Sequence, residues 1–163
     1  MKLSSILHHI RWKTLSAALA PAAVGTGLAL RNGGTLALFP FLCCGPSAFL
    51  IQIGTNLVND ALDYKNGVDG PKRLGPQRLS SPSSSHLFYF AGVLCFPLAL
   101  IFSLPALHLR GMTLLAIEVM CCLAGYLYTG GPFPLGYHAL GDLTVFVFFG
   151  IIATSAAQFV HHG

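Results

Sequence analysis

The fold class follows from one segment, His86-Leu-Phe-Tyr-Phe-Ala-Gly-Val-Leu-Cys-Phe-Pro-Leu-Ala-Leu-Ile-Phe-Ser-Leu-Pro-Ala-Leu107, which contains no Asp, Glu, Lys or Arg. About 20 apolar residues are enough for an α-helix to cross a bilayer. Further apolar runs occupy residues 14–30, 35–57, 112–128 and 143–160. The runs are continuously apolar rather than alternating, which disfavours a spanning β-barrel. The sequence therefore predicts an all-α, multi-pass transmembrane helical bundle of about five helices.

The composition supports this class and excludes others. The chain has 163 residues, of which 54% are hydrophobic and 9% are charged. A soluble domain carries about 25% charged residues, and an intrinsically disordered chain has low hydrophobicity and high charge. Nine Lys and Arg against five acids are too sparse for a nucleic-acid-binding surface. We expect residues 1–163 to form a single membrane domain, with membrane lipid around it.

The placement of the basic residues predicts the orientation. Seven of the nine precede the first apolar run or lie in the loop 58–85: Lys2, Arg11, Lys13, Lys65, Lys72, Arg73 and Arg78. Cytoplasmic loops carry an excess of Lys and Arg. The N-terminus and this loop are therefore expected on the cytoplasmic side of a cell inner membrane. The loop ends in the serine-rich tract 80–85, which we expect to be flexible.

A polar stripe continues the second apolar run, in the segment Gln52-Ile-Gly-Thr-Asn-Leu-Val-Asn-Asp-Ala-Leu-Asp-Tyr-Lys65. If the helix extends through this segment, one face carries Asn56, Asn59, Asp60 and Asp63, at positions i, i+3, i+4 and i+7. Gln52 extends the face one turn deeper, and the opposite positions are apolar. A stripe of carboxamides and carboxylates is thus predicted to enter the membrane from the cytoplasmic side.

This stripe and the basic loop beside it suggest a metal–diphosphate site. Uncompensated carboxylates at a bilayer edge repel one another and resist desolvation. Mg²⁺ prefers oxygen ligands and commonly binds one or two carboxylates together with substrate phosphates. Basic residues that suit the remaining phosphate oxygens follow at Lys65, Lys72, Arg73 and Arg78. The alternative is an ordinary solvated helix end, although such an end needs no polar groups at Gln52 and Asn56.

The motif Asn59-Asp60-x-x-Asp63 resembles the first aspartate-rich motif of the UbiA superfamily of intramembrane prenyltransferases. The wider run from Asn56 to Asp69, followed by Arg73-Leu-Gly-Pro-x-Arg78, resembles the 1,4-dihydroxy-2-naphthoate polyprenyltransferase branch, of menaquinone biosynthesis. Two further blocks, 11–26 and 128–150, are similar to the start of that branch's first helix and to its connection between the fourth and fifth helices. Many superfamily members carry a third acid where this chain has Gly67; here, as in the naphthoate branch, the acid is Asp69.

The resemblance implies transfer of a polyprenyl group from an allylic polyprenyl diphosphate to 1,4-dihydroxy-2-naphthoate. It assigns Asp60 and Asp63 as catalytic ligands of Mg²⁺, and Asp69 as a weaker third metal ligand. The implied substrate-binding residues are Asn56, Asn59, Lys65, Lys72, Arg73 and Arg78. Arg11 and Lys13 have two interpretations: they join the phosphate contacts, or they only flank the inner end of the first helix.

The family has about nine helices and a second aspartate-rich motif, whereas only Glu118 and Asp142 follow Asp69 here. The chain therefore resembles the N-terminal half of such an enzyme, truncated relative to the family fold. Three readings stay open: a prenyltransferase, or the half of one that supplies the first metal site and acts as a homodimer; an inactive truncated remnant; and the first-half subunit of a split prenyltransferase completed by a second chain. A transporter or channel is a more distant fourth reading. Little activity is expected without a partner, because metal would contact the diphosphate from one side.

Three residues outside the stripe are weaker candidates. Glu118 falls mid-span, and an intramembrane acid is a functional candidate by default, but the resemblance gives it no role. Tyr126 and Tyr128 either shield a cation with their ring faces or belong to the aromatic belt at the membrane interface.

Overall fold

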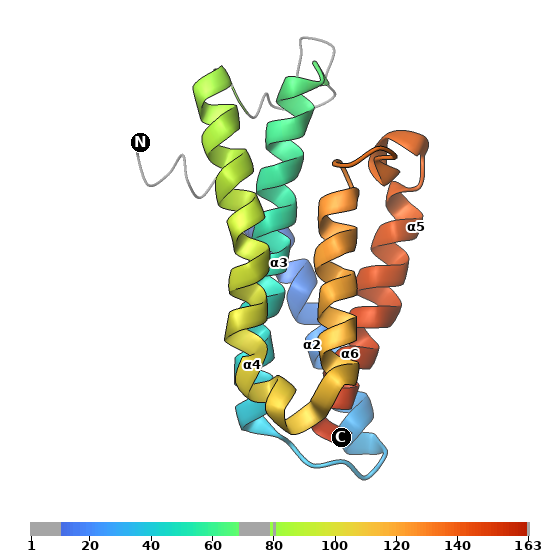
Figure 1. The fold of residues 1–163 in the computed structure, drawn as a ribbon. Helices are drawn as coiled ribbons and strands as arrows, with labels where there is room; N and C mark the ends of the chain where they lie inside the picture. Colours follow the sequence, from blue (N-terminus) through green and yellow to red (C-terminus); the bar gives the residue numbers. More distant parts are fainter. Residues whose placement is uncertain (1–10, 69–78, 80, 163) are drawn as a thin grey trace.

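The computed structural model describes residues 11–68, 79 and 81–162, which form a bundle of helices (Figure 1). The elements are α2 (Trp12–Arg31), α3 (Leu38–Lys65), α4 (Pro82–Leu127), the 3₁₀-helix η1 (Leu135–His138), α5 (Gly141–Val145), the π-helix η2 (Phe146–Ile152) and α6 (Ala153–His162). The last three follow one another without a gap and make one continuous rod. The described residues contain no strand, so the all-α prediction is confirmed.

Helix α4 is a hairpin with two arms, residues 82–110 and 112–127. Gly111 interrupts its 46 residues with φ 71° and ψ −165°, a conformation that only glycine adopts without strain. Figure 1 shows the chain reversing direction at this point. Together with α2, α3 and the final rod, the two arms account for the predicted number of helices.

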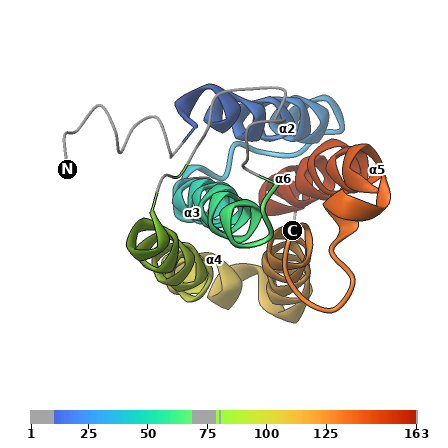
Figure 2. The ribbon, with the colours of Figure 1, turned by 90° about the horizontal axis from the view of Figure 1, so that it is seen from above.

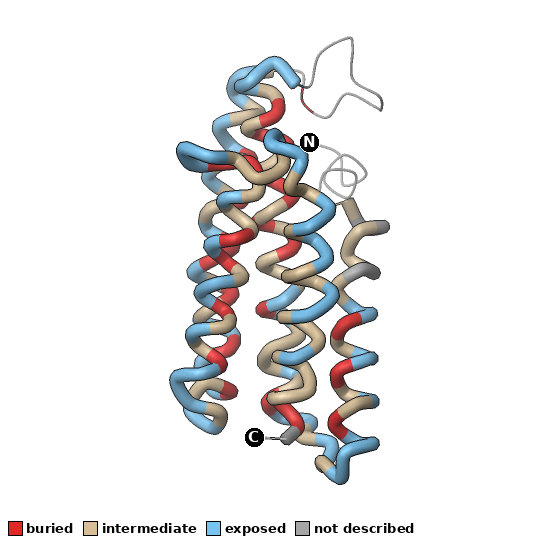
Figure 3. The backbone as a smooth tube through the Cα atoms, turned by 90° about the vertical axis from the view of Figure 1, so that its right-hand side faces the viewer, coloured by how far each residue is buried: buried red, intermediate tan, exposed pale blue. Residues whose placement is uncertain are grey.

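The structure also has the lengths and surface of a multi-pass membrane protein. Among the described residues, three helical stretches are long and apolar enough to cross a membrane: Leu38–Lys65, Pro82–Leu127 and Gly141–His161. A shorter apolar stretch covers Ala18–Arg31. Large apolar side chains such as Leu87, Phe90 and Met112 are exposed, and exposed positions are interspersed with buried ones along α3 and α4 (Figure 3). Such a surface suits contact with lipid.

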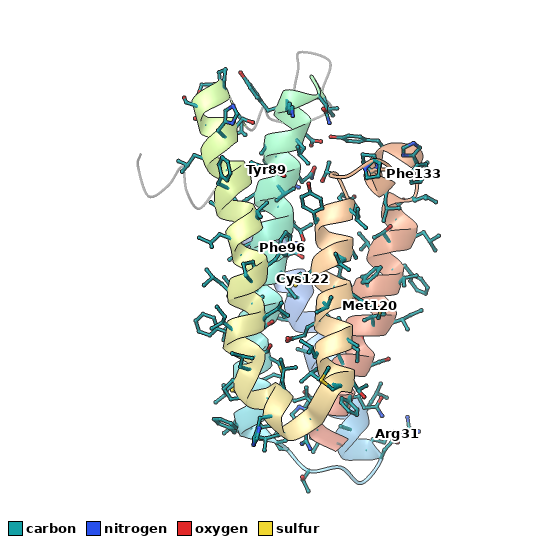
Figure 4. All side chains as sticks on the ribbon, viewed as in Figure 1. Arg31, Tyr89, Phe96, Met120, Cys122 and Phe133 are labelled. Carbon is teal, nitrogen blue, oxygen red and sulfur yellow. The ribbon has the colours of Figure 1, made fainter. Side chains whose placement is uncertain are left out.

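Helix α3 occupies the middle of the bundle, with α2, α4 and α6 around it (Figure 2). It packs closely on the first arm of α4 because glycines face each other there: a Cβ added at Gly54 would lie 2.8 Å from the carbonyl oxygen of Gly92. Small residues allow such close approach of helices in membranes. Val58 is fully buried in the same contact, next to Phe96 and Cys122, which lie on opposite arms of α4 (Figure 4).

The connection between α3 and α4 is shorter than the segment 58–85, because α3 continues to Lys65 and α4 begins at Pro82. The expectation of a flexible serine-rich tract was wrong from Ser81 onward. The Ser81 side chain accepts a hydrogen bond from the backbone N–H of Ser84 at 3.3 Å, and Pro82 occupies the first turn. A serine cap followed by proline is a strong signal for a helix start.

Candidate functional site

The predicted polar face of α3 is present. Gln52, Asn56, Asp60 and Asp63 are all buried, and Asn59 is partly buried. The helix continues without interruption through Lys65, as its periodicity predicted. Because α3 lies at the centre of the bundle, these side chains face protein rather than open solvent.

Asp60 is fully buried and pairs with Arg11, whose Nη2 donates a hydrogen bond to Asp60 Oδ1. Arg11 immediately precedes α2 and has a left-handed backbone, with φ 53° and ψ 54°. The turn is held by Thr14, whose backbone N–H and hydroxyl donate to the Arg11 carbonyl at 2.7 and 2.8 Å. A non-glycine residue in this conformation carries a backbone cost, and such residues cluster at functional sites. The ion pair with Asp60 gives Arg11 a contact that neither interpretation named, and its contact with phosphate stays a prediction.

Asp63 is held from a different part of the chain. The Tyr137 hydroxyl, in η1, donates to Asp63 Oδ1 at 2.7 Å, and Asn66 Nδ2 donates to the Tyr137 oxygen at 3.4 Å. Burial raises the pKa of Tyr137 to about 12, with a further contribution from the Asp63 carboxylate. The hydroxyl therefore stays protonated and remains a donor. Sequence reasoning missed this residue: Tyr137 stood in a block that carried the resemblance, but no spacing rule connected it to Asp63.

A cavity of about 340 Å³, here the outer cavity, lies between α2, α3, the second arm of α4 and the final rod. Its polar side chains include Arg11, Asn56 and Asn59, and Asn56 Nδ2 donates to Thr14 Oγ1 at 3.1 Å. Other parts of its wall are apolar, including Phe148 and Phe149 of η2. Cavities of this size commonly bind small molecules, and π-helical turns are frequent at functional sites.

The structure does not bring every predicted residue to the wall of this cavity: Asp60 and Asp63 are not among its lining residues, although Asp60 pairs with Arg11, which is one of them. Lys65 is exposed and lines a separate hollow of about 590 Å³, together with Tyr89, Tyr126 and Thr129. The hydroxyl groups of Tyr126 and Tyr89 share a hydrogen bond of 3.1 Å. Tyr128, in contrast to Tyr126, lines the outer cavity. The remaining predictions fall outside the described residues or side chains: Lys13, Asp69, Lys72, Arg73 and Arg78.

The donor atoms of the polar face are of the kind that Mg²⁺ binds. Within the described part of the chain no group of three or more His, Cys, Asp and Glu side chains lies close enough to hold a metal. Asp60 and Asp63 are one helical turn apart, however, and Mg²⁺ often takes only one or two carboxylates and completes its shell with water and phosphate oxygens. The donor chemistry therefore fits Mg²⁺, with the Arg11 guanidinium as the cation now beside Asp60.

The fold and the site define a multi-pass membrane protein. Two acids, one helical turn apart on α3, lie near the polar part of a cavity that is otherwise largely apolar. Residues 18–162 match the UbiA prenyltransferase family. The chain belongs to this family, as the aspartate-rich motif indicated.

Several curated relatives align over almost all of this chain. The 1,4-dihydroxy-2-naphthoate octaprenyltransferase of Mycobacterium tuberculosis is 35% identical over 153 residues, which cover 91% of this chain and 51% of that protein. The enzyme of the same name from Escherichia coli is 32% identical, covering 94% and 52%. UbiA prenyltransferase domain-containing protein 1 of Xenopus tropicalis is 31% identical, covering 99% and 48%. The chain thus spans about half the length of these relatives. No solved structure matches it significantly.

Proposed function

We propose that this chain forms the diphosphate-binding part of a Mg²⁺-dependent aromatic prenyltransferase. The reaction is transfer of a polyprenyl group from an allylic polyprenyl diphosphate to 1,4-dihydroxy-2-naphthoate, a step of menaquinone biosynthesis. The observation that carries the proposal is the meeting of Asp60, Arg11 and the carboxamides of the α3 face near the polar part of the outer cavity. Family membership supports the reaction class, and the relatives named for naphthoate prenylation support the acceptor.

In this proposal Asp60 and Asp63, with Asp69 as a third ligand, hold the metal. Bound Mg²⁺ would neutralise the charge that develops on the diphosphate leaving group. Tyr137 fixes the Asp63 carboxylate through its hydrogen bond. Arg11 balances the charge of buried Asp60.

The phosphate oxygens are assigned to the side chains around the acids. Asn56 and Asn59 line the outer cavity and offer amide donors. Further positive charge is assigned to Arg11, to Lys65 at the end of α3, and to the basic residues that follow it: Lys72, Arg73 and Arg78. Donors placed where negative charge builds up favour departure of the diphosphate.

The apolar part of the outer cavity is proposed to receive the prenyl group. Phe148 and Phe149 keep water away from the allylic cation that forms when the diphosphate leaves. Tyr128 lines the same cavity, and its ring face suits a cation. The aromatic acceptor then attacks the allylic carbon within this dry space.

The orientation is proposed from the charges. Arg11 precedes α2 and Lys65 ends α3, whereas Arg31 is the last residue of α2. Arg31 and Phe133 lie at opposite ends of the bundle (Figure 4). We place the end with the acids at the cytoplasmic face of a cell inner membrane, in a single membrane domain. Its active-site loop, expected at about residues 58–85, is reduced to the connection between α3 and α4, residues 66–81. We also propose that the full reaction uses groups from beyond these 163 residues, from a second chain or from a second copy of this one.

The test is Mg²⁺-dependent binding of a polyprenyl diphosphate to the purified chain in lipid nanodiscs, followed by product formation with 1,4-dihydroxy-2-naphthoate. We expect wild-type chain to bind the diphosphate only with Mg²⁺, and Asp63→Ala to lose this binding. Asp142→Ala, at an exposed acid at the start of α5, is the matched control. Failure of the wild-type chain to bind with Mg²⁺ would contradict the proposal. Turnover that needs a second-half chain added in trans would identify a split enzyme.

A further inference from the structure

A second polar cluster lies within the membrane-spanning part of the bundle. Glu118, on the second arm of α4, is buried and accepts a hydrogen bond at each carboxyl oxygen. Ser47 of α3 donates to Oε1 at 3.1 Å, and Ser103 of the first arm donates to Oε2. Both serines are almost completely buried. The cluster thus joins three helical segments, and the proposed chemistry gives it no task.

Glu118 and Ser47 line a small hollow of about 120 Å³, here the inner cavity. Its other walls come from α2, α3 and α6 and are largely apolar. Leu114, Val160 and Phe41 also line it and belong to an apolar cluster that contains Ala106. This part of the wall of the inner cavity is therefore apolar.

The outer and inner cavities adjoin. They share six wall residues: Ala18, Pro21, Ala48, Ile51, Cys121 and Ala153. Along α3 the outer cavity begins near Asn59, and the inner cavity reaches Ser47 and beyond. Twelve residues separate these positions, which is about 18 Å along a helix axis. An elongated ligand anchored by its head group at Asn59 would therefore extend toward Glu118.

The two cavities offer an apolar chain different surroundings. Beside Ile51 and Cys121 the chain meets apolar groups, and burial there is favourable. One or two turns deeper its end would meet a carboxyl group and a hydroxyl group. Burying the end of an apolar chain against polar groups is less favourable than burying it against apolar groups. The carboxyl group of Glu118 stays in place because the two serines hydrogen-bond to both of its oxygens.

We propose that Glu118, held by Ser47 and Ser103, limits how deeply a prenyl tail enters the bundle and so selects tail length. Tails that end at the six shared wall residues are favoured over tails that must pass Glu118. Glu118 is in this sense a specificity-determining residue. The inference rests on the proposed function, because it assigns the outer cavity to a polyprenyl diphosphate.

The experiment measures binding of farnesyl, geranylgeranyl and octaprenyl diphosphate to the full chain in nanodiscs with Mg²⁺. The readout is the ratio of Kd values between the longest and the shortest tail. Glu118→Leu replaces the polar wall with an apolar one, so we expect this ratio to shift toward the longest tail by about fivefold or more. Glu118→Gln keeps the hydrogen-bonding polarity and should retain the wild-type ratio.

A second variant tests the same passage without disturbing the buried cluster. Ala48 lines both cavities and its side chain is exposed into them, so Ala48→Phe adds bulk where space exists. We expect Ala48→Phe to shift the ratio the opposite way, toward the shortest tail. Leu42→Phe is the control, because Leu42 is exposed on the same helix and lines neither cavity.

The outcomes separate the two proposals. An unchanged ratio in both Glu118→Leu and Ala48→Phe, with tight binding by wild type, would overturn the role of Glu118 and leave the proposed function standing. If Glu118→Leu does not fold, an unchanged ratio of Kd values in Ala48→Phe is by itself enough to overturn the role of Glu118. Wild-type chain that binds none of the three diphosphates would overturn the proposed function itself.

Discussion

Among the described residues, buried acids occur in two places, at Asp60 and Asp63 and at Glu118. The two places differ in the side chains that bind the carboxyl groups. Asp60 is paired with the guanidinium of Arg11, whereas Glu118 is held by the hydroxyls of two serines. The guanidinium is always charged in proteins. A serine hydroxyl is neutral and offers a hydrogen bond without charge.

This difference separates chemistry from selectivity. An acid with a cation beside it can exchange that cation for a metal or share it with a phosphate. Placing an unpaired charge inside a membrane costs free energy. We therefore assign the acid with neutral partners to shaping a cavity rather than to binding a metal. On this basis we propose that the reaction takes place at the Asp60 end of α3 and that the limit on substrate size lies near Ser47.

The largest effect is expected from removing the charged partner. Arg11→Gln removes the guanidinium that pairs with the fully buried Asp60. Breaking a buried ion pair in this way costs about 3–5 kcal/mol. Ser103→Ala, which removes a neutral partner of Glu118, should cost only about 1–2 kcal/mol. Thermal unfolding in nanodiscs measures both.

A double variant identifies the cause. Arg11→Gln combined with Asp60→Asn removes both charges, so most of the lost stability should return. If Arg11→Gln proved no more destabilising than Ser103→Ala, the distinction between the two clusters would be wrong.

The next effect concerns function. Asp60→Asn keeps the shape of the side chain and removes its charge, so Mg²⁺-dependent binding of a polyprenyl diphosphate should weaken about 100-fold. Isothermal titration across a range of Mg²⁺ concentrations gives the value. The same acid-to-amide change at the exposed Asp142 should leave binding unaltered. A loss at Glu118→Gln as large as that at Asp60→Asn would remove the contrast between the clusters.

Sequence alone predicted the helices and the polar face because both depend on local patterns. Hydropathy and length were enough to locate the apolar runs, and the 3.6-residue period placed Asn56, Asp60 and Asp63 on one side of α3. The serine-rich tract was misread because composition suggests flexibility, whereas Ser81 before Pro82 is a helix start.

The partners of the acids could not be predicted in the same way. Arg11 and Asp60 are 49 positions apart, and Tyr137 and Asp63 are 74 apart. These pairs form only when α2 and η1 pack beside α3, so no local period reveals them. Ser47 and Ser103 are single serines within apolar runs, and nothing in their immediate neighbours marks them as partners of Glu118.

A packing variant tests how much the fold depends on the close contact between Gly54 of α3 and Gly92 of α4. Gly92→Leu would push a side chain into the backbone of α3, since even a Cβ at this position lies 2.9 Å from the Gly54 oxygen. Overpacking of this kind costs about 1–3 kcal/mol. Gly27→Leu is the control, because a Cβ at Gly27 meets no atom within 4 Å. Equal melting temperatures for the two variants would show that the α3–α4 contact tolerates separation.

The smallest effect is expected at Tyr137, which acts through Asp63. Tyr137→Phe removes the hydroxyl that donates to Asp63 Oδ1 and leaves the ring. Removing a side chain that orients a metal ligand typically weakens metal affinity by about 10–100-fold. Because Tyr137 is partly exposed, we expect a loss of about tenfold, at the lower end of this range. The apparent Mg²⁺ affinity should weaken while the ratio between long and short prenyl tails stays constant, because Tyr137 lines neither the outer nor the inner cavity. A change in tail preference without a change in Mg²⁺ dependence would mean that the two ends of the cavity are coupled rather than separate.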